Sequence, residues 1–517
     1  MLKKPQVIYP FLFAVYPLLS FFSHNIQELK IEIIINPLII ITISGIILYI
    51  TISLLLKDKY KAGILISVLS FFFFSFGHIA NLLKQEYLAK FKLFEIGNLF
   101  PTWAVLLIIT VFFTVRSNKN FRKITSFLNI ISIVLVAIPV FHVSSVYLER
   151  KPPMETIKKI SPNPVNVSPD MPDIYYIIVE RYPSSRSFKN FYQYDNSEFT
   201  AFLEKNGFYI AKDSRANYLI TCLSLASSLN MVYLDELIKD IDKESVDNMS
   251  LYNLIENSKI APYLKSKGYK YVHIGSNSAG TIKSDLADFS YTYKDSLLLN
   301  EFSAKFIEMT MIFPIIRTLN IIPDLEYRNA HRVLITDQII NMEKLTKIEG
   351  PKFVFAHLFL THSPYVFDRS GNAVTEEEEN SRYFKENFIN QLVFANTKYQ
   401  QLIETILANS KKDPVIIFQS DEGPYFERLW KSHYYFDLHQ ATDDELREKS
   451  WIMNAYHLPG RAKDKLYPSI TPVNTFRLIF NLYFGENFPL LPDKTYAHES
   501  FDKPYKLFEV TEKVKVY

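Results

Sequence analysis

The stretch DIYYIIVERY (residues 173–182) decides the fold of the larger part of this chain. Its apolar residues run consecutively and leave no polar face, which is the pattern of a strand buried on both sides in a parallel sheet. A second run of this kind, DPVIIFQSDEGPY, spans residues 413–425. Glu180 follows the first run, and Asp421 and Glu422 follow the second. Because ligands of open α/β sheets bind beyond the carboxyl ends of the strands, we expect these three acids to converge on one pocket.

A third stretch, NYLITCLSLASSLNM at residues 217–231, supplies a hydroxyl group. Thr221 lies where its apolar run stops, and Ser224 follows in a segment of small residues that we expect to be helical. A hydroxyl that faces three acids is a suitable arrangement for a nucleophile activated by a metal ion. Small hydroxyl residues also cap helices routinely, and capping is compatible with nucleophilicity. In the same way, Glu180 beside Arg181 could form a buried ion pair with no catalytic part.

The chain after residue 172 alternates two kinds of pattern. Strand-like runs occur at 173–180, 269–275, 352–359 and 414–420, and helical patterns occur at 195–206, 251–267 and 385–410. This alternation predicts an α/β domain over residues 172–517, with a mostly parallel central sheet covered by helices on both faces. Residues 148–171 are rich in Pro and Lys, which predicts an extended linker before that domain.

The N-terminal part of the chain differs sharply in composition from the rest. Five apolar stretches, each about as long as a helix that crosses a bilayer, lie at 7–23, 35–56, 62–83, 101–117 and 124–147. Five such stretches in succession are rare in a protein that faces water. We therefore predict a transmembrane domain of five helices over residues 1–147. No span has an acid or a basic residue at its centre, where a transporter would need one.

Basic residues in short loops mark the cytoplasmic side of a membrane protein. They precede the first span, at Lys3 and Lys4, and recur in the loops at 57–61 and 116–123. The loop at 24–34 holds one Lys against two Glu. The contrast is weaker in the loop at 84–100, where Glu86 and Glu95 only partly balance three Lys. The N-terminus is therefore expected in the cytoplasm of a multi-pass protein. With an odd number of spans, everything after about residue 150 is expected on the outer side of the cytoplasmic membrane.

Overall charge and cysteine content narrow the function classes. The chain has 517 residues and a formal net charge of +3, so nothing in the charge balance points to a nucleic-acid partner. Its single cysteine, Cys222, cannot form an intrachain disulfide. The sequence predicts no oligomeric state.

Six stretches of the outer domain, taken together, are specific enough to indicate a resemblance to a known family. They are PDIYYIIVERY, YDNSEF (194–199), NYLITCLSLASSLNM, PKFVFAHLFLTHSPYVFD (351–368), IIFQSDEGPY and LYPSITPVNTFRLIFNLYFG (466–485). In these stretches, from residue 172 to about 504, the chain resembles the sulfatase-like branch of the alkaline phosphatase superfamily. Its layout is similar to that of the membrane-anchored lipoteichoic acid synthases and phosphoethanolamine transferases, which have five membrane helices before an extracytoplasmic catalytic domain. The resemblance implies an alkaline-phosphatase-like fold for the outer domain.

The resemblance also implies roles for individual positions. Glu180 matches an acidic metal ligand that follows the first strand. Thr221 falls where the family places its nucleophile, which is a Thr in the transferases. Asp421 and Glu422 fall on a pair of metal ligands, and here Glu422 replaces the usual His.

Two further residues are expected to bind the anionic group of the substrate. His362, in THSPY, matches a His that contacts phosphate or sulfate oxygens, and Arg181 could help to stabilise charge in the transition state. Cys222 lies one place past the nucleophile position, so the modified cysteine of the sulfatases is not supported. His357 alternates with apolar residues in the strand 352–359 and is expected to be a hydrogen-bonded core histidine rather than a ligand.

The expected donor set bears on the metal. Glu180, Asp421, Glu422 and the Thr221 oxygen form an all-oxygen set, which suits Mn²⁺ or Mg²⁺ better than the His-containing sites typical of Zn²⁺. We therefore expect one divalent cation, Mn or Mg rather than Zn. The alternative is that the loss of the His has disabled the site.

These inferences lead to two functional hypotheses. The first is a membrane-anchored, metal-dependent hydrolase or transferase that acts on phosphate or sulfate esters of a lipid or envelope glycan, through a covalent intermediate on Thr221. An anchor near the bilayer raises the local concentration of a membrane-confined substrate, which favours one with a lipid end. The second is a catalytically silent envelope protein that keeps the sulfatase fold as a binding or scaffold module. The sequence does not separate hydrolase from transferase, since both share the first half-reaction.

Overall fold

A computed structural model describes residues 5–83, 96–117, 119–150, 171–291, 301–319, 321, 327–432, 435–460 and 462–516. The chain divides into two compact units. Residues 1–150 and 295–330 form the first unit, and residues 151–294 and 331–517 form the second. The linker predicted at 148–171 lies largely outside the described residues.

Five helices make up most of the first unit. They are α1 (Tyr9–His24), α2 (Glu32–Leu56), α3 (Lys59–Leu83), α4 (Ile96–Arg116) and α5 (Arg122–Glu149). Large apolar side chains on α2, α4 and α5 are exposed, for example Leu54, Ile108 and Phe141. A protein surrounded by water rarely exposes so much contiguous apolar surface, whereas lipid is a suitable neighbour for it.

Four of the described helices are long and apolar enough to cross a membrane. They are Glu32–Leu56, Lys59–Ala80, Leu99–Arg116 and Arg122–Leu148. The span predicted at 7–23 forms α1, but α1 has only 16 residues. At 1.5 Å per residue this helix measures about 24 Å, less than the roughly 30 Å of a hydrocarbon core. The five predicted stretches thus form five helices, four of them long enough to cross a membrane and one shorter.

The second unit is built on a seven-stranded sheet with the order β2-β7-β6-β1-β5-β3-β4. Its strands are β1 (Ile174–Val179), β2 (Tyr209–Ile210), β3 (Lys270–Ile274), β4 (Phe289–Tyr291), β5 (Lys352–Leu358), β6 (Val415–Gln419) and β7 (Asn454–His457). The pairs among β6, β1, β5, β3 and β4 are parallel, and β7 pairs antiparallel with β6 and β2. The prediction of a mostly parallel sheet is confirmed, and its four strand-like runs correspond to β1, β3, β5 and β6.

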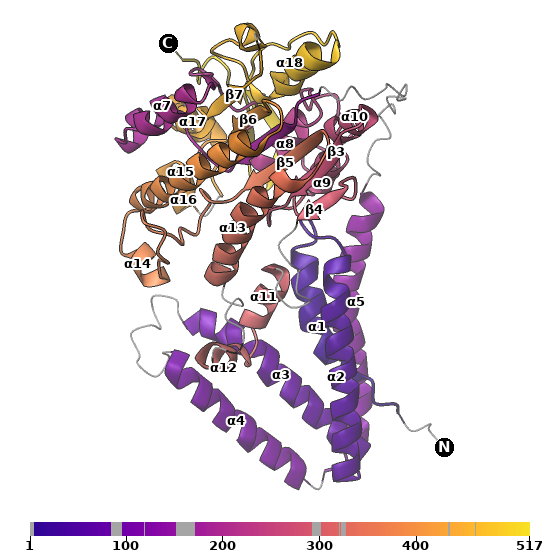
Figure 1. Ribbon diagram of the computed structural model, residues 1–517. Coiled ribbons are helices and arrows are strands. Elements are labelled where there is room, and N and C mark those ends of the chain that lie inside the picture. The colour runs from indigo at the N-terminus through magenta and orange to yellow at the C-terminus, as the bar shows by residue number, and fades with distance from the viewer. Residues whose placement is uncertain are drawn as a thin grey trace. The chain divides into compact units, whose positions relative to one another are not determined.

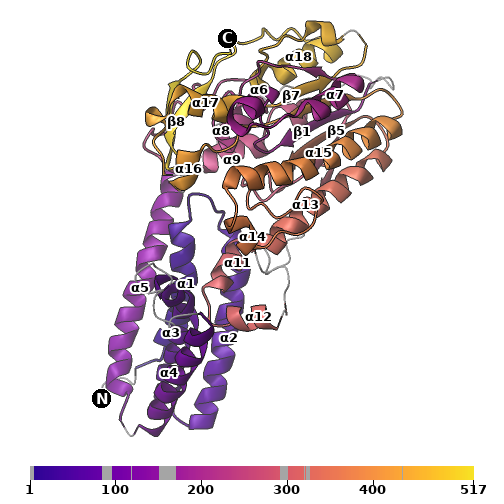
Figure 2. The same cartoon turned by 90° about the vertical axis from the view of Figure 1, so that its left-hand side faces the viewer.

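Helices cover both faces of this sheet. One core contains Ile174, Tyr176 and Ile178 of β1, together with side chains of α8 (Thr221–Ser228), α9 (Met249–Glu256), α10 (Ile260–Ser266) and α18 (Pro472–Phe484). The other contains Tyr175, Ile177 and Val179, together with side chains of α7 (Ser197–Lys205), α13 (Tyr327–Lys344) and α15 (Phe384–Asn409). Figures 1 and 2 show α13 and α15 side by side on the second face. Alternate residues of one strand thus enter opposite cores, as the continuous apolar run predicts.

Shorter elements complete the two units. The second unit also holds α6 (Ser185–Ser187), a π-helical turn (Phe188–Tyr192), α14 (Glu376–Asn380), α16 (Glu427–Lys431), α17 (Asp443–Ser450) and an antiparallel pair, β8 (Tyr496–Ser500) and β9 (Lys503–Glu509). Single 3-10 turns lie at Leu345–Lys347, Leu438–Gln440 and Ala462–Lys465. The first unit adds α11 (Glu301–Glu308) and α12 (Phe313–Thr318).

The helical pattern predicted at 251–267 is interrupted. It forms α9 and α10, which are separated at residues 257–259. Pro262 lies in the first turn of α10, where its missing N–H costs no hydrogen bond. In one continuous helix, the same proline would remove an internal hydrogen bond and clash with the preceding turn.

Candidate active site

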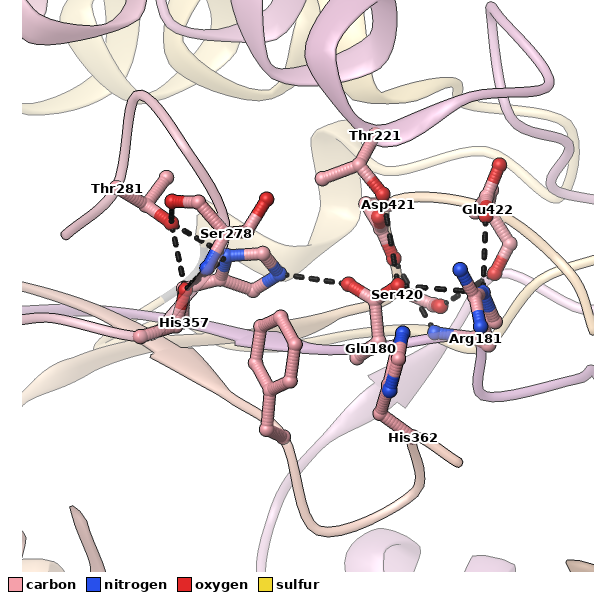
Figure 3. A network of polar contacts seen from close by, with 12 residues as sticks. Glu180, Arg181, Thr221, Ser278, Thr281, His357, His362, Ser420, Asp421 and Glu422 are labelled. Atoms are coloured by element: carbon pink, nitrogen blue, oxygen red, sulfur yellow. Dashed lines mark hydrogen bonds and ion pairs between the residues drawn. The ribbon is translucent and has the colours of Figure 1, made fainter. Parts of the chain in front are cut away.

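The predicted site residues meet at the carboxyl ends of neighbouring strands. β1 and β6 pair in parallel, with Ile178 opposite Gln419, so Glu180 and Asp421 leave the same edge of the sheet. Thr221 is the first residue of α8. Figure 3 shows Glu180, Arg181, Thr221, Asp421 and Glu422 gathered in one polar network. The prediction that separate stretches converge here agrees with this geometry.

Glu180 lies at the centre of the network and is 1% exposed. Its Oε1 atom is 3.4 Å from the Thr221 hydroxyl and 3.3 Å from Arg181 Nε. Its Oε2 atom is 2.8 Å from His357 Nε2. Burial by itself raises the pKa of Glu180, but the hydrogen bond from His357 and the charge of Arg181 outweigh it and hold that pKa below its ordinary value. Glu180 is therefore the acid of this site that ionises most readily.

His357 contacts the candidate site from strand β5. It lies on β5, is fully buried, and is hydrogen-bonded as expected of a core histidine. Its Nε2 atom faces the Glu180 carboxylate, and its Nδ1 atom is 3.0 Å from the Thr281 hydroxyl. An ionised carboxylate can only accept, so we assign the ring hydrogen to Nε2. The ring therefore orients Glu180 toward the site.

Three side chains could hold a metal ion together. One ligand atom each of Glu180, His357 and Asp421 lies within 4.8 Å of the other two. Within the described residues, Asp421 Oδ2 and Glu422 Oε2 are buried and have no hydrogen-bond partner. Buried polar atoms without a partner are costly, and a cation held by the three-residue group would give the Asp421 carboxylate a partner. The residues present thus fit a divalent cation.

Asp421 is the second carboxylate of this group. Its Oδ1 atom accepts a hydrogen bond of 3.2 Å from the Arg181 backbone N–H, and its carbonyl accepts one of 2.7 Å from the Ser224 hydroxyl. The latter bond connects the loop after β6 to α8. Burial, together with the charges of Glu180 and Glu422, raises the pKa of Asp421 well above its usual range. A cation at the site would favour its ionised form.

Arg181 crosses the network between the acids. Its backbone has a φ of +53°, an uncommon conformation for a residue other than glycine. Its Nε atom is 3.1 Å from Glu422 Oε1, and its guanidinium group lies 3.8 Å from the centre of the Tyr425 ring. Its Nη2 atom also donates to the Tyr425 hydroxyl. The ion pair with Glu180 is present, and Glu422 is a second acidic partner of the Arg181 side chain.

Lys449 also contacts the site, although no sequence pattern predicts it. It belongs to α17 and is fully buried, with its Nζ atom 2.8 Å from Glu422 Oε1 and 3.0 Å from the Gly423 carbonyl. Gly423 in turn donates a 2.9 Å hydrogen bond to the Lys449 carbonyl. A Cβ atom at residue 423 would lie 2.4 Å from the Glu448 carbonyl oxygen. The glycine is therefore what allows α17 to approach and bring a buried cation to Glu422.

The environment of Glu422 differs from that of the other two acids. One of its oxygens is shared by Lys449 and Arg181, while the other has no partner among the described residues. Burial raises the pKa of Glu422, and the charges of Lys449 and Arg181 oppose that rise. Glu422 does not belong to the three-residue metal group. Because its first oxygen is already paired with Lys449 and Arg181, only its second oxygen could bind a metal.

His362 lies beside the same network, as expected. It follows β5, and its ring is 4.9 Å from that of Phe359 and 6.0 Å from that of His331. Burial and the nearby charge of Arg181 lower the pKa of His362 well below its ordinary value, so the ring is neutral. Thr361, the preceding residue, donates its hydroxyl hydrogen to the Glu180 carbonyl and thereby fixes the loop.

Comparison with known proteins gives a limited result. No protein-family model and no curated protein matches the sequence. The solved structures it resembles include phosphoethanolamine transferases and sulfatases. Lipooligosaccharide phosphoethanolamine transferase A, an integral membrane protein of Neisseria meningitidis, is 13% identical, and the match covers 91% of this chain and 95% of that chain with a TM-score of 0.41.

Two matches are confined to soluble domains. The periplasmic domain of EptC from Escherichia coli is 13% identical over 66% of this chain and 92% of that chain, with a TM-score of 0.41. A candidate sulfatase of Bacteroides fragilis, YidJ, is 12% identical over 65% of this chain and 83% of that chain, with a TM-score of 0.37. At this level of similarity, the reaction has to be inferred from the side chains of this chain.

Proposed function

We propose that this chain is a membrane-anchored, metal-dependent enzyme that transfers or hydrolyses a phosphate or sulfate ester of a lipid or envelope glycan on the outer face of the cytoplasmic membrane. The observation that carries the proposal is the position of the Thr221 hydroxyl, 3.4 Å from Glu180 Oε1, in a buried site whose Asp421 and Glu422 each keep one oxygen without a partner among the described residues. The four long apolar helices support the membrane anchor.

In this proposal, Thr221 acts as the nucleophile. Its oxygen would attack the phosphorus or sulfur atom while its proton passes to a carboxylate of the site, where Glu180 Oε1 accepts a hydrogen bond from the Thr221 hydroxyl at 3.4 Å. The new bond joins Thr221 Oγ1 to the phosphoryl or sulfuryl group, and the bond to the leaving alcohol breaks as that oxygen takes up a proton. Water or an alcohol acceptor would then attack the same atom and release Thr221. Because Thr221 begins α8, the helix N-terminus favours the negative charge that develops nearby.

The cationic side chains support the binding of an anionic group. Arg181 is held in place by Glu422 and the Tyr425 ring, so its guanidinium is oriented before any ligand arrives. His362 is neutral, and its ring can donate a hydrogen bond without adding charge. Lys449 touches Glu422 rather than open space, so it offsets the charge of that acid instead of binding substrate directly.

We propose that Glu180, Thr221, Asp421 and the second oxygen of Glu422 hold the cation. When bound, a divalent cation would lower the pKa of the threonine hydroxyl and withdraw charge from the transferred group. An all-oxygen set favours Mn or Mg, whereas direct ligation by His357 would favour Zn. Metal analysis of the purified full chain and of a His357→Ala variant separates the two. Retention of Mn or Mg by both supports the oxygen set, while Zn lost on substitution assigns His357 as a ligand.

A catalytically silent protein is the second candidate. The ion pair between Lys449 and Glu422 favours it, because the ammonium group of Lys449 already pairs with one oxygen of Glu422, a predicted metal ligand. In that case the site would bind an anionic group without turnover.

The full chain in detergent micelles or nanodiscs tests the choice, with a chromogenic phosphodiester and a chromogenic sulfate ester as probes. Thr221→Ala should remove nearly all turnover, while Thr221→Ser should retain part of it. Ser228→Ala is a matched control, since Ser228 is a buried hydroxyl of the same helix that donates a weak 3.5 Å hydrogen bond to the Leu225 carbonyl. Equal turnover of Thr221→Ala and the unmodified chain would refute the nucleophile, and absence of turnover in both would favour the silent protein.

A further inference from the structure

Residues 301–321 follow β4 of the second unit, here called the α/β unit, in the sequence. They nevertheless belong to the first unit, which holds α1 to α5. They form α11 and α12, and Figures 1 and 2 show these helices beside α1 and α3. We call residues 301–321 the docked segment. Its contacts with the membrane helices involve both backbone and side chains.

The backbone of the docked segment binds α3 directly. Gly77 donates a 3.0 Å hydrogen bond to the Met309 carbonyl, and Phe73 accepts one of 2.8 Å from the Met311 N–H. Phe73 and Gly77 are four residues apart, so these two groups are ones that an α-helix normally joins to each other. A Cβ atom on Gly77 would lie 2.4 Å from Met309 Cα. Only glycine therefore permits this approach without a shift of the backbone.

Aromatic packing fixes the other side of the docked segment. Phe302 and Phe306, one turn apart on α11, are both nearly buried. The Phe302 ring stacks on that of Phe21 at 5.0 Å, and the Phe306 ring lies 6.0 Å from that of Phe21 and 5.7 Å from that of Phe74. The docked segment thus packs against both α1 and α3.

Its contacts lie toward the far ends of these helices. Phe73 and Gly77 are 14 and 18 residues beyond Lys59, the first residue of α3. At 1.5 Å per residue they lie about 21 to 27 Å along that helix. A hydrocarbon core is about 30 Å thick, so a segment docked there lies at the depth of the second leaflet. By the orientation inferred from the basic loops, this is the outer leaflet.

Four exposed side chains of the docked segment are large and apolar. Ile312, Ile315, Leu319 and Ile321 are each at least 40% exposed. We propose that these four side chains lie among the acyl chains of the outer leaflet, so that the docked segment attaches a part of the chain outside the predicted spans to the bilayer. Continuity with the exposed apolar faces of the same unit supports lipid as the occupant. This inference does not depend on the reaction at Thr221.

Site-directed fluorescence on the full chain in nanodiscs tests it. Single cysteines at Ile315 and Leu319 carry a small fluorophore, and part of the lipid is replaced by lipid with brominated acyl chains, which quench on contact. Ile108→Cys on α4 provides the lipid-facing reference, and Leu490→Cys in the α/β unit provides the aqueous one, since both native side chains are exposed. The chain without an introduced cysteine reports labelling of the buried Cys222.

Quenching at residues 315 and 319 should be comparable to that at residue 108 and several-fold greater than that at residue 490. Gly77→Ala should reduce it, whereas Gly45→Ala should not, because a Cβ on Gly45 meets only the Phe11 ring, at 3.8 Å. Quenching no greater than at residue 490 would overturn the proposal. Efficient disulfide crosslinking of Leu319→Cys between copies would also overturn it, since the face would then belong to a second copy of the chain.

Discussion

Substitution of Lys449 by Met should destabilise the α/β unit strongly. The change preserves most of the side-chain volume but removes the ammonium group that lies 2.8 Å from Glu422 Oε1, where both side chains are 1% exposed or less. Removing one partner of a buried ion pair costs about 3 to 5 kcal/mol, because the other charge remains buried without compensation. Arg181 still contacts Glu422 at 3.1 Å, so we expect a loss of about 3 kcal/mol.

Denaturant unfolding of the full chain, followed by tryptophan fluorescence in a Trp103→Phe background, provides the measurement. The remaining tryptophans, Trp430 and Trp451, both lie in the α/β unit. Lys431→Met is the matched control, because Lys431 pairs with Glu427 at the surface and such pairs contribute at most about 1 kcal/mol. The double variant Lys449→Met with Glu422→Leu should recover most of the loss.

The loss of stability in Lys449→Met should also depend on pH. Without Lys449, the pKa of Glu422 should rise further, so the folded state binds a proton more tightly than the unfolded state does. The loss of stability should therefore shrink as pH falls. Equal stabilities of Lys449→Met and the unmodified chain, or a double variant no more stable than Lys449→Met, would refute the idea that an uncompensated Glu422 causes the loss.

Three further predictions concern individual contacts. Gly423→Ala should cost about 1 to 3 kcal/mol of unfolding free energy by overpacking against the Glu448 carbonyl, and it should weaken metal binding measured by calorimetry; unchanged values of both would contradict this. Burial and, to a smaller extent, the charge of Lys449 lower the pKa of His498 to about 3 in the folded state. As pH falls, the unfolded state therefore takes up a proton first, and about 2 kcal/mol of stability should be lost between pH 6.5 and pH 5. His498→Phe should remove that part of the loss, and an unchanged dependence of stability on acid pH would contradict the prediction. Glu180→Gln should abolish turnover and weaken metal binding while the circular dichroism spectrum stays unchanged, and a variant with full activity would exclude Glu180 as a ligand or proton acceptor.

The strands and the three acids could be predicted because their signals are local. An uninterrupted apolar run such as 174–179 indicates a strand buried on both faces, and the acids follow directly where two such runs end. The convergence of Glu180 and Asp421 then follows from the parallel sheet. The position of Thr221 relied on the resemblance to a known family as well as on the end of an apolar run.

The contacts that the sequence did not predict depend on tertiary structure. Lys449 belongs to DDELREKS, a segment that reads as a solvated helix, and it reaches the site because Gly423 lets that helix approach. His357 alternates with apolar residues in a strand, a pattern that does not distinguish a core histidine from one that faces a carboxylate. The attachment of residues 301–321 to α3 rests on backbone hydrogen bonds to Phe73 and Gly77, which no periodicity reveals.

The most direct test of the central claim is a search for a covalent group on Thr221. The full chain with its bound metal would be mixed with a phosphodiester or sulfate-ester substrate, quenched in acid within the first turnover, digested and examined by mass spectrometry. We expect one phosphoryl or sulfuryl group on the peptide that contains Thr221, and none on the same peptide of Thr221→Ala. Turnover with an unmodified Thr221 peptide at every quench time, or a modification that persists in Thr221→Ala, would contradict it.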